Sequence, residues 1–279
     1  MRRAGQADLP AIRAFLGARM DRAMFPRSNL ARYGLDGDHR YAPRFWVDEE
    51  KGVVCDVLTV SKSGMVMPAL PSGDWTGAAK ALAGRTIEGF IGPAEEVRPL
   101  IAAMGLAGHR ANLDHDEPHF AMDLAALVIP DGPGRLVPLG EAPEAEMIGW
   151  RIAYETEALG LTAEAANAAG RQAYEHFVAE GTHRVLVHEG RALARPGSTP
   201  SSPEIVQIGG VYTPPALRGR GHARRAVALH LAEARAQGVR RATLFSASDM
   251  AARAYRAIGF RRIGNWSLVL FAEPWTVPR

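Results

Sequence analysis

The sequence predicts an α+β fold in two domains, with helices flanking mixed β-sheets. At 279 residues the chain exceeds the roughly 100 to 200 residues of one ordinary domain. Short strand-like stretches alternate with helix-like ones, in the order helix, strands and then a mixture of both. The turn-forming segment Pro130-Asp131-Gly132-Pro133-Gly134 separates two apolar stretches. We therefore expect one domain over residues 1–130 and another over residues 131–279.

The expected elements of the first domain rest on apolar periodicity and on turn residues between the apolar stretches. They follow in the order helix, three strands, helix, strand, helix and a closing stretch, over residues 9–24, 44–47, 52–60, 64–68, 74–82, 86–91, 94–104 and 120–128. In the second domain we expect a strand over 135–139, helices over 144–159 and 162–180, a hairpin of 183–187 and 191–194, and a loop over 196–203.

Composition excludes several classes of protein. No apolar run approaches the roughly 20 residues that span a bilayer, and no long apolar segment follows the basic N-terminus, so we expect a cytoplasmic protein. The formal net charge of +3 is too small to indicate a nucleic acid or a membrane as partner. The single cysteine, Cys55, lies in an apolar stretch and is interpreted as a packed thiol rather than a nucleophile.

The most informative segment is a strand, a glycine loop and a helix. Residues 204–213 have strand character, and the pair Gly209-Gly210 inside them predicts a bulge or a close backbone approach. The loop that begins at Arg218 contains Gly219 and Gly221 and leads into a helix. Glycines let backbone amides converge, and a helix start carries about half a positive charge. With the nearby arginines at 218, 220, 224 and 225, this order predicts a phosphate-binding site.

Over residues 204–271 the chain resembles the GNAT superfamily of acyl-CoA N-acyltransferases. The acyl-CoA loop of that family reads Arg or Gln, two residues, Gly, one residue, and Gly or Ala, which Arg218, Gly221 and Ala223 match. A second family element is a strand followed by an alanine-rich helix with a tyrosine and a Gly-Phe ending, supplied here by residues 243–246 and 248–260. The family often has Asn near the start of that helix, where this chain has Ser248, so a side-chain contact there is in doubt.

The resemblance implies two GNAT-like domains, each a mostly antiparallel mixed sheet, with a V-shaped acyl-CoA cleft in the C-terminal one. No Arg-x-x-Gly-x-Gly/Ala pattern follows a strand in residues 1–130, so that domain resembles a degenerate, silent GNAT domain. Acetyl-CoA is the implied co-substrate, without a metal. The implied binding residues lie on the bulged strand, in the loop and at the start of the last helix: Gly209, Val211, Tyr212, Thr213, Arg218, Gly219, Arg220, Gly221, His222, Ala223, Arg224 and Ser248.

Two side chains have catalytic roles implied by the resemblance. Tyr255 matches the family tyrosine that hydrogen-bonds or protonates the leaving thiolate; the alternative is a buried aromatic residue on an amphipathic helix. Donation from a phenol near pKa 10 to a thiolate near 8.5 is uphill by about 1.5 units, so a hydrogen bond alone is sufficient. Glu204 is the candidate base, although the family glutamate falls nearer Ile205, and the alternative is an exposed carboxylate at the strand end.

These features predict an N-acetyltransferase of class EC 2.3.1 that acts on a primary amine of a small molecule, amino acid or peptide, by direct attack through a tetrahedral intermediate. The alternative is a catalytically weak acyl-CoA-binding regulatory module. An ATP site is disfavoured because no Walker lysine follows Gly221. His115 and His119 flank Pro118, which prevents a helical ligand pair, so no metal is assigned.

Overall fold

The computed structural model describes residues 1–246 and 248–278, without the side chains of residues 159 and 200–202. Their packing forms two compact units, one of residues 1–119 with 262–278 and one of residues 120–261. Packing thus groups residues 120–130 with the second unit, while the division of roles between 1–130 and 131–279 stays a prediction. None of the helices in the described residues combines the length and apolar character needed to cross a membrane.

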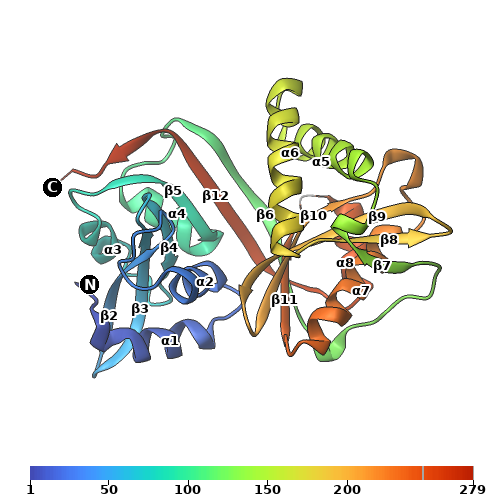
Figure 1. Ribbon diagram of the computed structural model, residues 1–279. Coiled ribbons are helices and arrows are strands. Elements are labelled where there is room, and N and C mark those ends of the chain that lie inside the picture. The colour runs from blue at the N-terminus through green and yellow to red at the C-terminus, as the bar shows by residue number, and fades with distance from the viewer. Residues whose placement is uncertain (247, 279) are drawn as a thin grey trace. The chain divides into compact units, whose positions relative to one another are not determined.

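In the first unit, helices cover both faces of one sheet (Figure 1). Its elements are β1 (Arg2–Arg3), α1 (Leu9–Ala18), α2 (Met24–Tyr33), β2 (Pro43–Glu50), β3 (Val53–Ser61), β4 (Met65–Ala69), α3 (Trp75–Ala81), β5 (Thr86–Pro93), α4 (Ala94–Ala103) and the start of β6 (Ala111–Asp123). The strand order is β1-β2-β3-β4-β5-β12, where β12 is Arg261–Thr276. Within this order β4 and β5 are parallel, and the other pairs are antiparallel.

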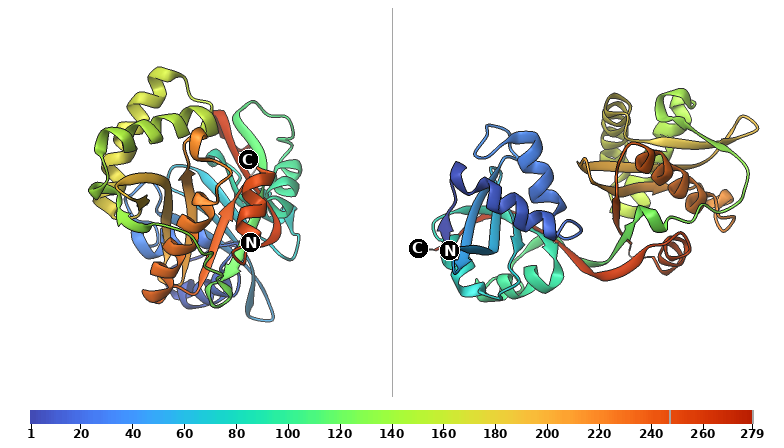
Figure 2. Two further views of the ribbon diagram at one scale, coloured as in Figure 1. Left: turned by 90° about the vertical axis from the view of Figure 1, so that its right-hand side faces the viewer. Right: turned by 90° about the horizontal axis from the view of Figure 1, so that it is seen from below.

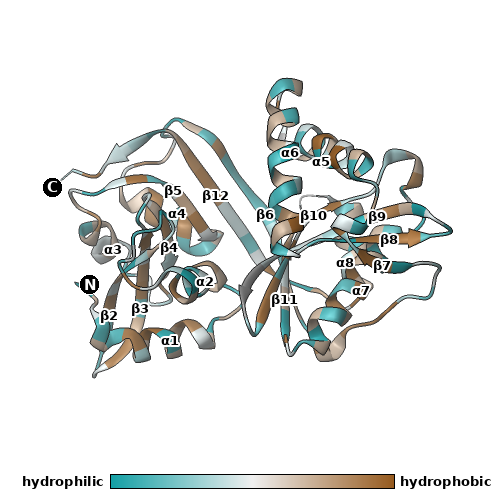
Figure 3. Cartoon of the chain, viewed as in Figure 1, coloured by the Kyte–Doolittle hydropathy of each residue, from teal (hydrophilic) through white to brown (hydrophobic). Residues whose placement is uncertain are grey.

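Alternate residues of β2 divide the core of this unit into two layers. Phe45 and Val47 pack with residues of α1 and α2, whereas Trp46 between them packs with residues of α3 and α4. This follows from the period of two along a strand, which sends successive side chains to opposite faces. The right-hand view of Figure 2 shows the two pairs of helices on either side of the sheet. Both faces are covered, and accordingly β3 and β4 are hydrophobic along most of their length in Figure 3.

The second unit has the same order of elements along the chain. They are β7 (Arg135–Pro138), α5 (Glu144–Leu159), α6 (Ala163–Glu180), β8 (Arg184–His188), β9 (Arg191–Ser202), β10 (Ile205–Tyr212), α7 (His222–Ala236), β11 (Arg241–Phe245) and α8 (Asp249–Arg256). The strand order is β7-β8-β9-β10-β11-β6. The parallel pair is again formed by the strands before and after the third helix, here β10 and β11.

The two units therefore share one topology, and the chain contains two repeats of it, the first from β1 to β6 and the second from β7 to β12. The last strand of each repeat joins the sheet of the other repeat. β12, the last strand of the second repeat, pairs with β5 in the first unit. The end of β6, the last strand of the first repeat, lies beside β11 in the second unit. The predicted α+β class, with mostly antiparallel mixed sheets flanked by helices in two domains of one kind, is confirmed.

Three expected elements were wrong in extent. The single helix over 9–24 is two helices, because α1 ends at Ala18 and α2 begins at Met24. The closing stretch expected over 120–128 belongs only in part to a strand, because β6 begins earlier, at Ala111, and ends at Asp123. The loop over 196–203 is mostly strand, because β9 continues to Ser202. In the described register its pairs with β8 reach Ala194, a separate bridge joins His183 to Gly197, and its further pairs are with β10.

Candidate functional site

The glycine loop connects a short 3₁₀ turn, Pro215–Leu217, to α7. Gly219 has φ +76° and Gly221, the N-cap of α7, has φ +80°. L-residues avoid this conformation, which explains glycine at both positions. A loop of this kind directs successive backbone N–H groups to one side at a helix N-terminus, where the helix dipole also favours negative charge. The loop and helix start are therefore suited to bind a phosphate group.

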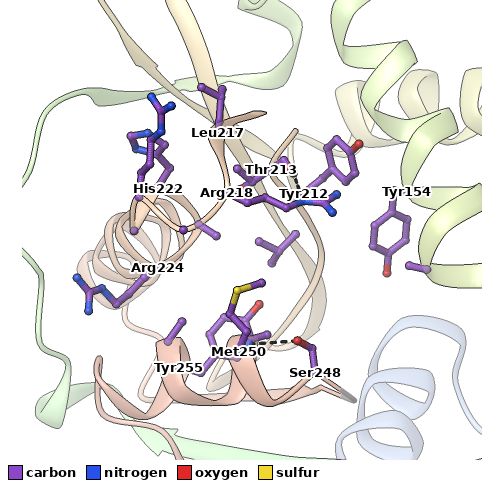
Figure 4. Close-up of a pocket in the computed structure, with 18 of the residues that line it drawn as sticks. Tyr154, Tyr212, Thr213, Leu217, Arg218, His222, Arg224, Ser248, Met250 and Tyr255 are labelled. Atoms are coloured by element: carbon purple, nitrogen blue, oxygen red, sulfur yellow. Dashed lines mark hydrogen bonds between the residues drawn. The ribbon is translucent and has the colours of Figure 1, made fainter. Parts of the chain in front are cut away.

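A cavity of about 680 Å³ lies between this loop, β10, α5 and α8 (Figure 4). Twelve of the residues expected from the sequence line it: Val211, Tyr212, Thr213, Arg218, Gly219, Arg220, Gly221, His222, Ala223, Arg224, Ser248 and Tyr255. Sequence reasoning missed the contribution of α5, which supplies Tyr154, Glu157 and Ala158. Figure 4 shows Tyr154 reaching in from α5, while Met250 and Tyr255 rise from α8.

The strand β10 is bulged beside the cavity. In its register with β9, Gly209 pairs with Gly197 and Tyr212 with Arg195, so three steps along β10 match two along β9. One extra residue is the definition of a β-bulge, and Gly210 within it has φ +60°. Pairing with β11 ends at Ile208 and Leu244. The two parallel strands therefore part just before the bulge, as the glycine pair predicted.

Two residues of the second motif have distinct environments at α8. Tyr255 lines the cavity but is only 8% exposed, and its ring meets Phe260 edge-on with centroids 6.0 Å apart. Burial raises the pKa of Tyr255 well above its usual range, so its hydroxyl stays protonated at neutral pH. The hydroxyl of Ser248 accepts a hydrogen bond from the Ala251 amide at 3.4 Å and caps the helix. Ser248 thus has a structural role as N-cap whatever else it binds.

Glu157, on α5, partly neutralises the positive charge of the loop. Arg218 donates from Nη2 to Glu157 Oε2 at 2.5 Å and from Nε to the Thr213 carbonyl at 2.9 Å. These contacts and the hydroxyl of Tyr212 hold the pKa of Glu157 below its usual value, with the Arg218 hydrogen bond as the largest cause. Arg225 instead donates to the carbonyls of Pro130, Pro133 and Gly134, away from the cavity. Burial, with the charge of Arg220, lowers the pKa of His222, which favours its neutral form.

Glu204 and Gly209 are not among the residues that line the cavity. Glu204 stands in the turn before β10, and Tyr212 ends that strand, eight residues further along. At about 3.3 Å per residue this separation is about 26 Å. The Glu204 carboxylate lies 3.9 Å from the guanidinium of Arg240. Glu204 accordingly lies far from Tyr212 and does not line the cavity on which Tyr255 and the loop lie.

Comparison with known proteins agrees with this geometry. Residues 145–260 match the family model described as Acetyltransferase (GNAT) family. A GCN5-related N-acetyltransferase from Sphaerobacter thermophilus superposes with a TM-score of 0.56 at 17% identity, covering 100% of this chain and 95% of that one. A GCN5-related N-acetyltransferase from Kribbella flavida gives 0.54 at 17% identity, covering 92% and 95%.

A GNAT-family acetyltransferase from Colwellia psychrerythraea gives a TM-score of 0.52 at 12% identity, covering 96% of this chain and 98% of that one. At such identities these likenesses concern the fold alone. A comparison by sequence with curated proteins found no match. The loop, the bulged strand and the tyrosine helix all fall within the range matched by the family model. Residues 145–260 of this chain form a GNAT acetyltransferase domain.

Proposed function

We propose that this chain is an acetyl-CoA-dependent N-acetyltransferase that acts on a primary amine. The observation that carries the proposal is the loop of residues 218–221, whose two glycines at positive φ lie at the start of α7 on the same cavity as the β10 bulge and Tyr255. The loop amides suit a diphosphate, and Arg220 and Arg224 line the same cavity. Residues 131–279 carry this activity in the proposal, and residues 1–130 have no catalytic part.

The reaction follows from what each part of the cavity offers. The open edge of β10 pairs with the pantetheine arm as an added strand would. A backbone N–H at the bulge polarises the thioester carbonyl while the amine nitrogen attacks the carbonyl carbon. The resulting tetrahedral intermediate collapses as the carbon–sulfur bond breaks and the thiolate leaves. Tyr255, kept protonated by burial, donates a hydrogen bond to that sulfur.

Deprotonation of the amine falls to solvent in this proposal. A lysine-like amine has a pKa of about 10.4, so only about one molecule in a thousand is neutral near pH 7.4. Glu157 is the single carboxylate among the described residues that line the cavity, and its ion pair with Arg218 makes it a weaker base. We therefore expect the rate to rise with pH until the amine itself is neutral.

A second candidate is a catalytically weak acyl-CoA-binding module, and one observation favours it. Glu204 does not line the cavity, and Glu157 is occupied by Arg218, so the described lining residues offer no free carboxylate to act as an efficient base. The two candidates share the binding of acyl-CoA and differ in turnover.

Calorimetry with CoA and with acetyl-CoA tests the shared claim. A panel of amino acids, small amines and peptides, followed by mass spectrometry of the products, tests the difference. We expect one acetyl-CoA site per chain and an acetylated product from at least one class of amine, formed more slowly by Tyr255→Phe. Tight binding with no product from any amine would establish the module, and no binding of either carrier would refute both candidates.

A further inference from the structure

The side chain of Arg195, on β9, is fully buried beside the bulge of β10. It is 0% exposed, and burial lowers its pKa to about 10, so it stays charged at neutral pH. Its Nη2 donates to the carbonyl oxygen of Gly210 at 3.2 Å, while Nε and Nη1 have no hydrogen-bond partner among the described residues. A buried guanidinium with most of its donors unused is not a stabilising feature. Its contact with Gly210 therefore calls for another explanation.

The Gly210 carbonyl belongs to the peptide group whose orientation the sheet leaves open. Register pairing with β9 stops at Gly209 and resumes at Tyr212, and pairing with β11 stops at Ile208. In the described register, neither neighbouring strand pairs with Gly210 or Val211. Gly210 also has φ +60°, where glycine has wide conformational freedom. The hydrogen bond from Arg195 is the side-chain contact to this carbonyl among the described residues.

The geometry of a trans peptide links the orientation of the Gly210 carbonyl to that of the Val211 N–H. The peptide group is planar, and no cis bond occurs in the part of the chain that the structure describes, so the N–H of Val211 points opposite to the C=O of Gly210. The carbonyl is directed to Arg195, which is buried and does not line the cavity, whereas Val211 does line it. The Val211 N–H is therefore directed away from the buried guanidinium, and Val211 itself lines the cavity.

We propose that Arg195 is a positioning residue that aims and polarises the Val211 N–H as the oxyanion donor, an inference that rests on the proposed acetyltransferase function. A cation that hydrogen-bonds a peptide carbonyl draws charge through the peptide and makes its N–H a stronger donor. During attack the thioester carbonyl oxygen gains negative charge, which this N–H accommodates. The peptide is held in place before the reaction, so it does not reorganise as the charge develops.

The neighbours of Arg195 provide a matched control. Arg151, on α5, reaches to 3.4 Å from where a Cβ on Gly210 would lie, and it forms an ion pair with Glu155. His183 reaches to 3.5 Å from the same point, and burial and nearby Arg195 lower its pKa, so it is neutral. Arg151 has no recorded hydrogen bond to the Gly210 carbonyl. The double variant Arg151→Met with Glu155→Gln thus perturbs the same buried cluster without removing that bond.

Infrared difference spectroscopy of bound acetyl-CoA, labelled with ¹³C at the thioester carbonyl, tests the proposal together with the rate of thiol release. In the wild type we expect the carbonyl stretch below its value in water. In Arg195→Met we expect it to return toward that value and thiol release to slow by about 10- to 100-fold, less than loss of a whole oxyanion donor costs. Acetyl-CoA affinity should change by less than about threefold, because the contacts of the diphosphate and the pantetheine arm remain and only the hydrogen bond at the thioester carbonyl weakens.

Stability separates positioning from support of the fold. Met has a volume similar to that of the arginine stem and removes a poorly paired buried charge, so Arg195→Met should unfold at the wild-type temperature or above it. Arg195→Lys keeps a cation with a donor and should recover part of the carbonyl shift, and the Arg151 and Glu155 double variant should keep all of it. A wild-type stretch and rate in Arg195→Met, or loss of its fold, would overturn the inference and leave the acetyltransferase proposal standing. A wild type that does not bind acetyl-CoA would overturn both.

Discussion

Arg218 in the glycine loop donates to Glu157 at the end of α5 across 2.5 Å, and the hydroxyl of Tyr212 donates to the other oxygen of the same carboxylate at 3.1 Å. A carboxylate therefore stands in a cavity whose loop is built for an anion, and it neutralises one of the arginines there. An incoming diphosphate meets both the repulsion of Glu157 and a less positive Arg218. Glu157 thus sets a limit on the affinity of the site for acyl-CoA.

Replacing Glu157 by Gln should tighten CoA binding. The amide keeps an acceptor for Arg218 but removes the negative charge, so we expect Kd to fall by about three- to tenfold at low ionic strength, with a smaller gain at high salt because salt screens the charge. Calorimetry at two salt concentrations measures this. Glu164→Gln, which removes an exposed carboxylate from α6 outside the cavity, should leave Kd unchanged. Weaker binding in Glu157→Gln would show that Glu157 supports the loop rather than opposing the ligand.

Gly221→Ala should weaken CoA binding at least tenfold. A Cβ at this position meets nothing closer than 3.5 Å, so the effect comes from the φ of +80°, where an L-residue is strained by about 1–2 kcal/mol. In the variant we expect the loop to relax away from the conformation in which its backbone N–H groups point to one side, and this change weakens binding of the diphosphate. Gly149→Ala is the matched control, because Gly149 lies inside α5 with open space around it. That change should stabilise the chain by about 0.5–1 kcal/mol and leave Kd alone; thermal unfolding and calorimetry measure the two effects.

Tyr255→Phe should lower kcat about tenfold or more while leaving the KM for acetyl-CoA nearly constant, because the hydroxyl acts on the departing sulfur. Since burial raises the pKa of Tyr255, its hydroxyl stays protonated beyond pH 10. The rate of the wild type should therefore climb with pH toward the pKa of the amine without a falling limb near pH 10. Tyr174→Phe, at a buried tyrosine outside the cavity, serves as control. A falling limb that Tyr255→Phe abolishes would mean that Tyr255 ionises at its ordinary pKa.

His119 should make the first unit sensitive to acid. Burial lowers the pKa of His119 from 6.5 to about 3, so the folded chain resists a proton that the unfolded chain accepts. Its contribution to stability is complete above pH 6.5 and is lost as the pH falls from 6.5 toward 3. We expect about 2 kcal/mol of this contribution to be gone at pH 5.

Urea unfolding of the wild type and of His119→Phe at pH 8 and pH 5 isolates this effect. Phe keeps an aromatic ring against Trp266, whose centroid lies 5.0 Å from that of His119, and it cannot titrate. The difference in unfolding free energy between the two proteins should shift by about 2 kcal/mol in favour of Phe at pH 5. An equal pH dependence in both proteins would place the histidine in contact with water.

Local sequence patterns predicted most of the helices and strands and most of the residues that line the cavity. Helices such as α6 follow apolar periodicity, and the loop at Arg218 and the capped helix at Ser248 are written in consecutive residues. β6 was misjudged because its first half, from Ala111 to His119, is polar and contains a proline. The exchange of last strands between the repeats leaves no mark in the sequence, because it depends on which sheet a strand joins and not on its residues.

Residues brought to the site by packing were beyond such reasoning. Tyr154 and Glu157 share a face of α5, three residues apart, but nothing in that helix shows that it lies over a loop about sixty residues later. Arg195 lies in a strand that also contains Arg191 and several Ser and Thr residues, so nothing in the sequence distinguishes it. Its contact with Gly210 depends on the pairing of β9 and β10 around the bulge. Glu204 was proposed from the resemblance, although counting back from Arg218 pointed to Ile205, and it lies at the end of β10 that is remote from the cavity.

Titration of acetyl-CoA into the wild type and into Gly221→Ala, at one pH and one salt concentration, tests most directly whether the loop holds the carrier. We expect one acetyl-CoA site per chain in the wild type and at least tenfold weaker binding in the variant, with the fold of both proteins intact by circular dichroism. Absence of binding to the folded wild type, or equal binding by the two proteins, would contradict this expectation.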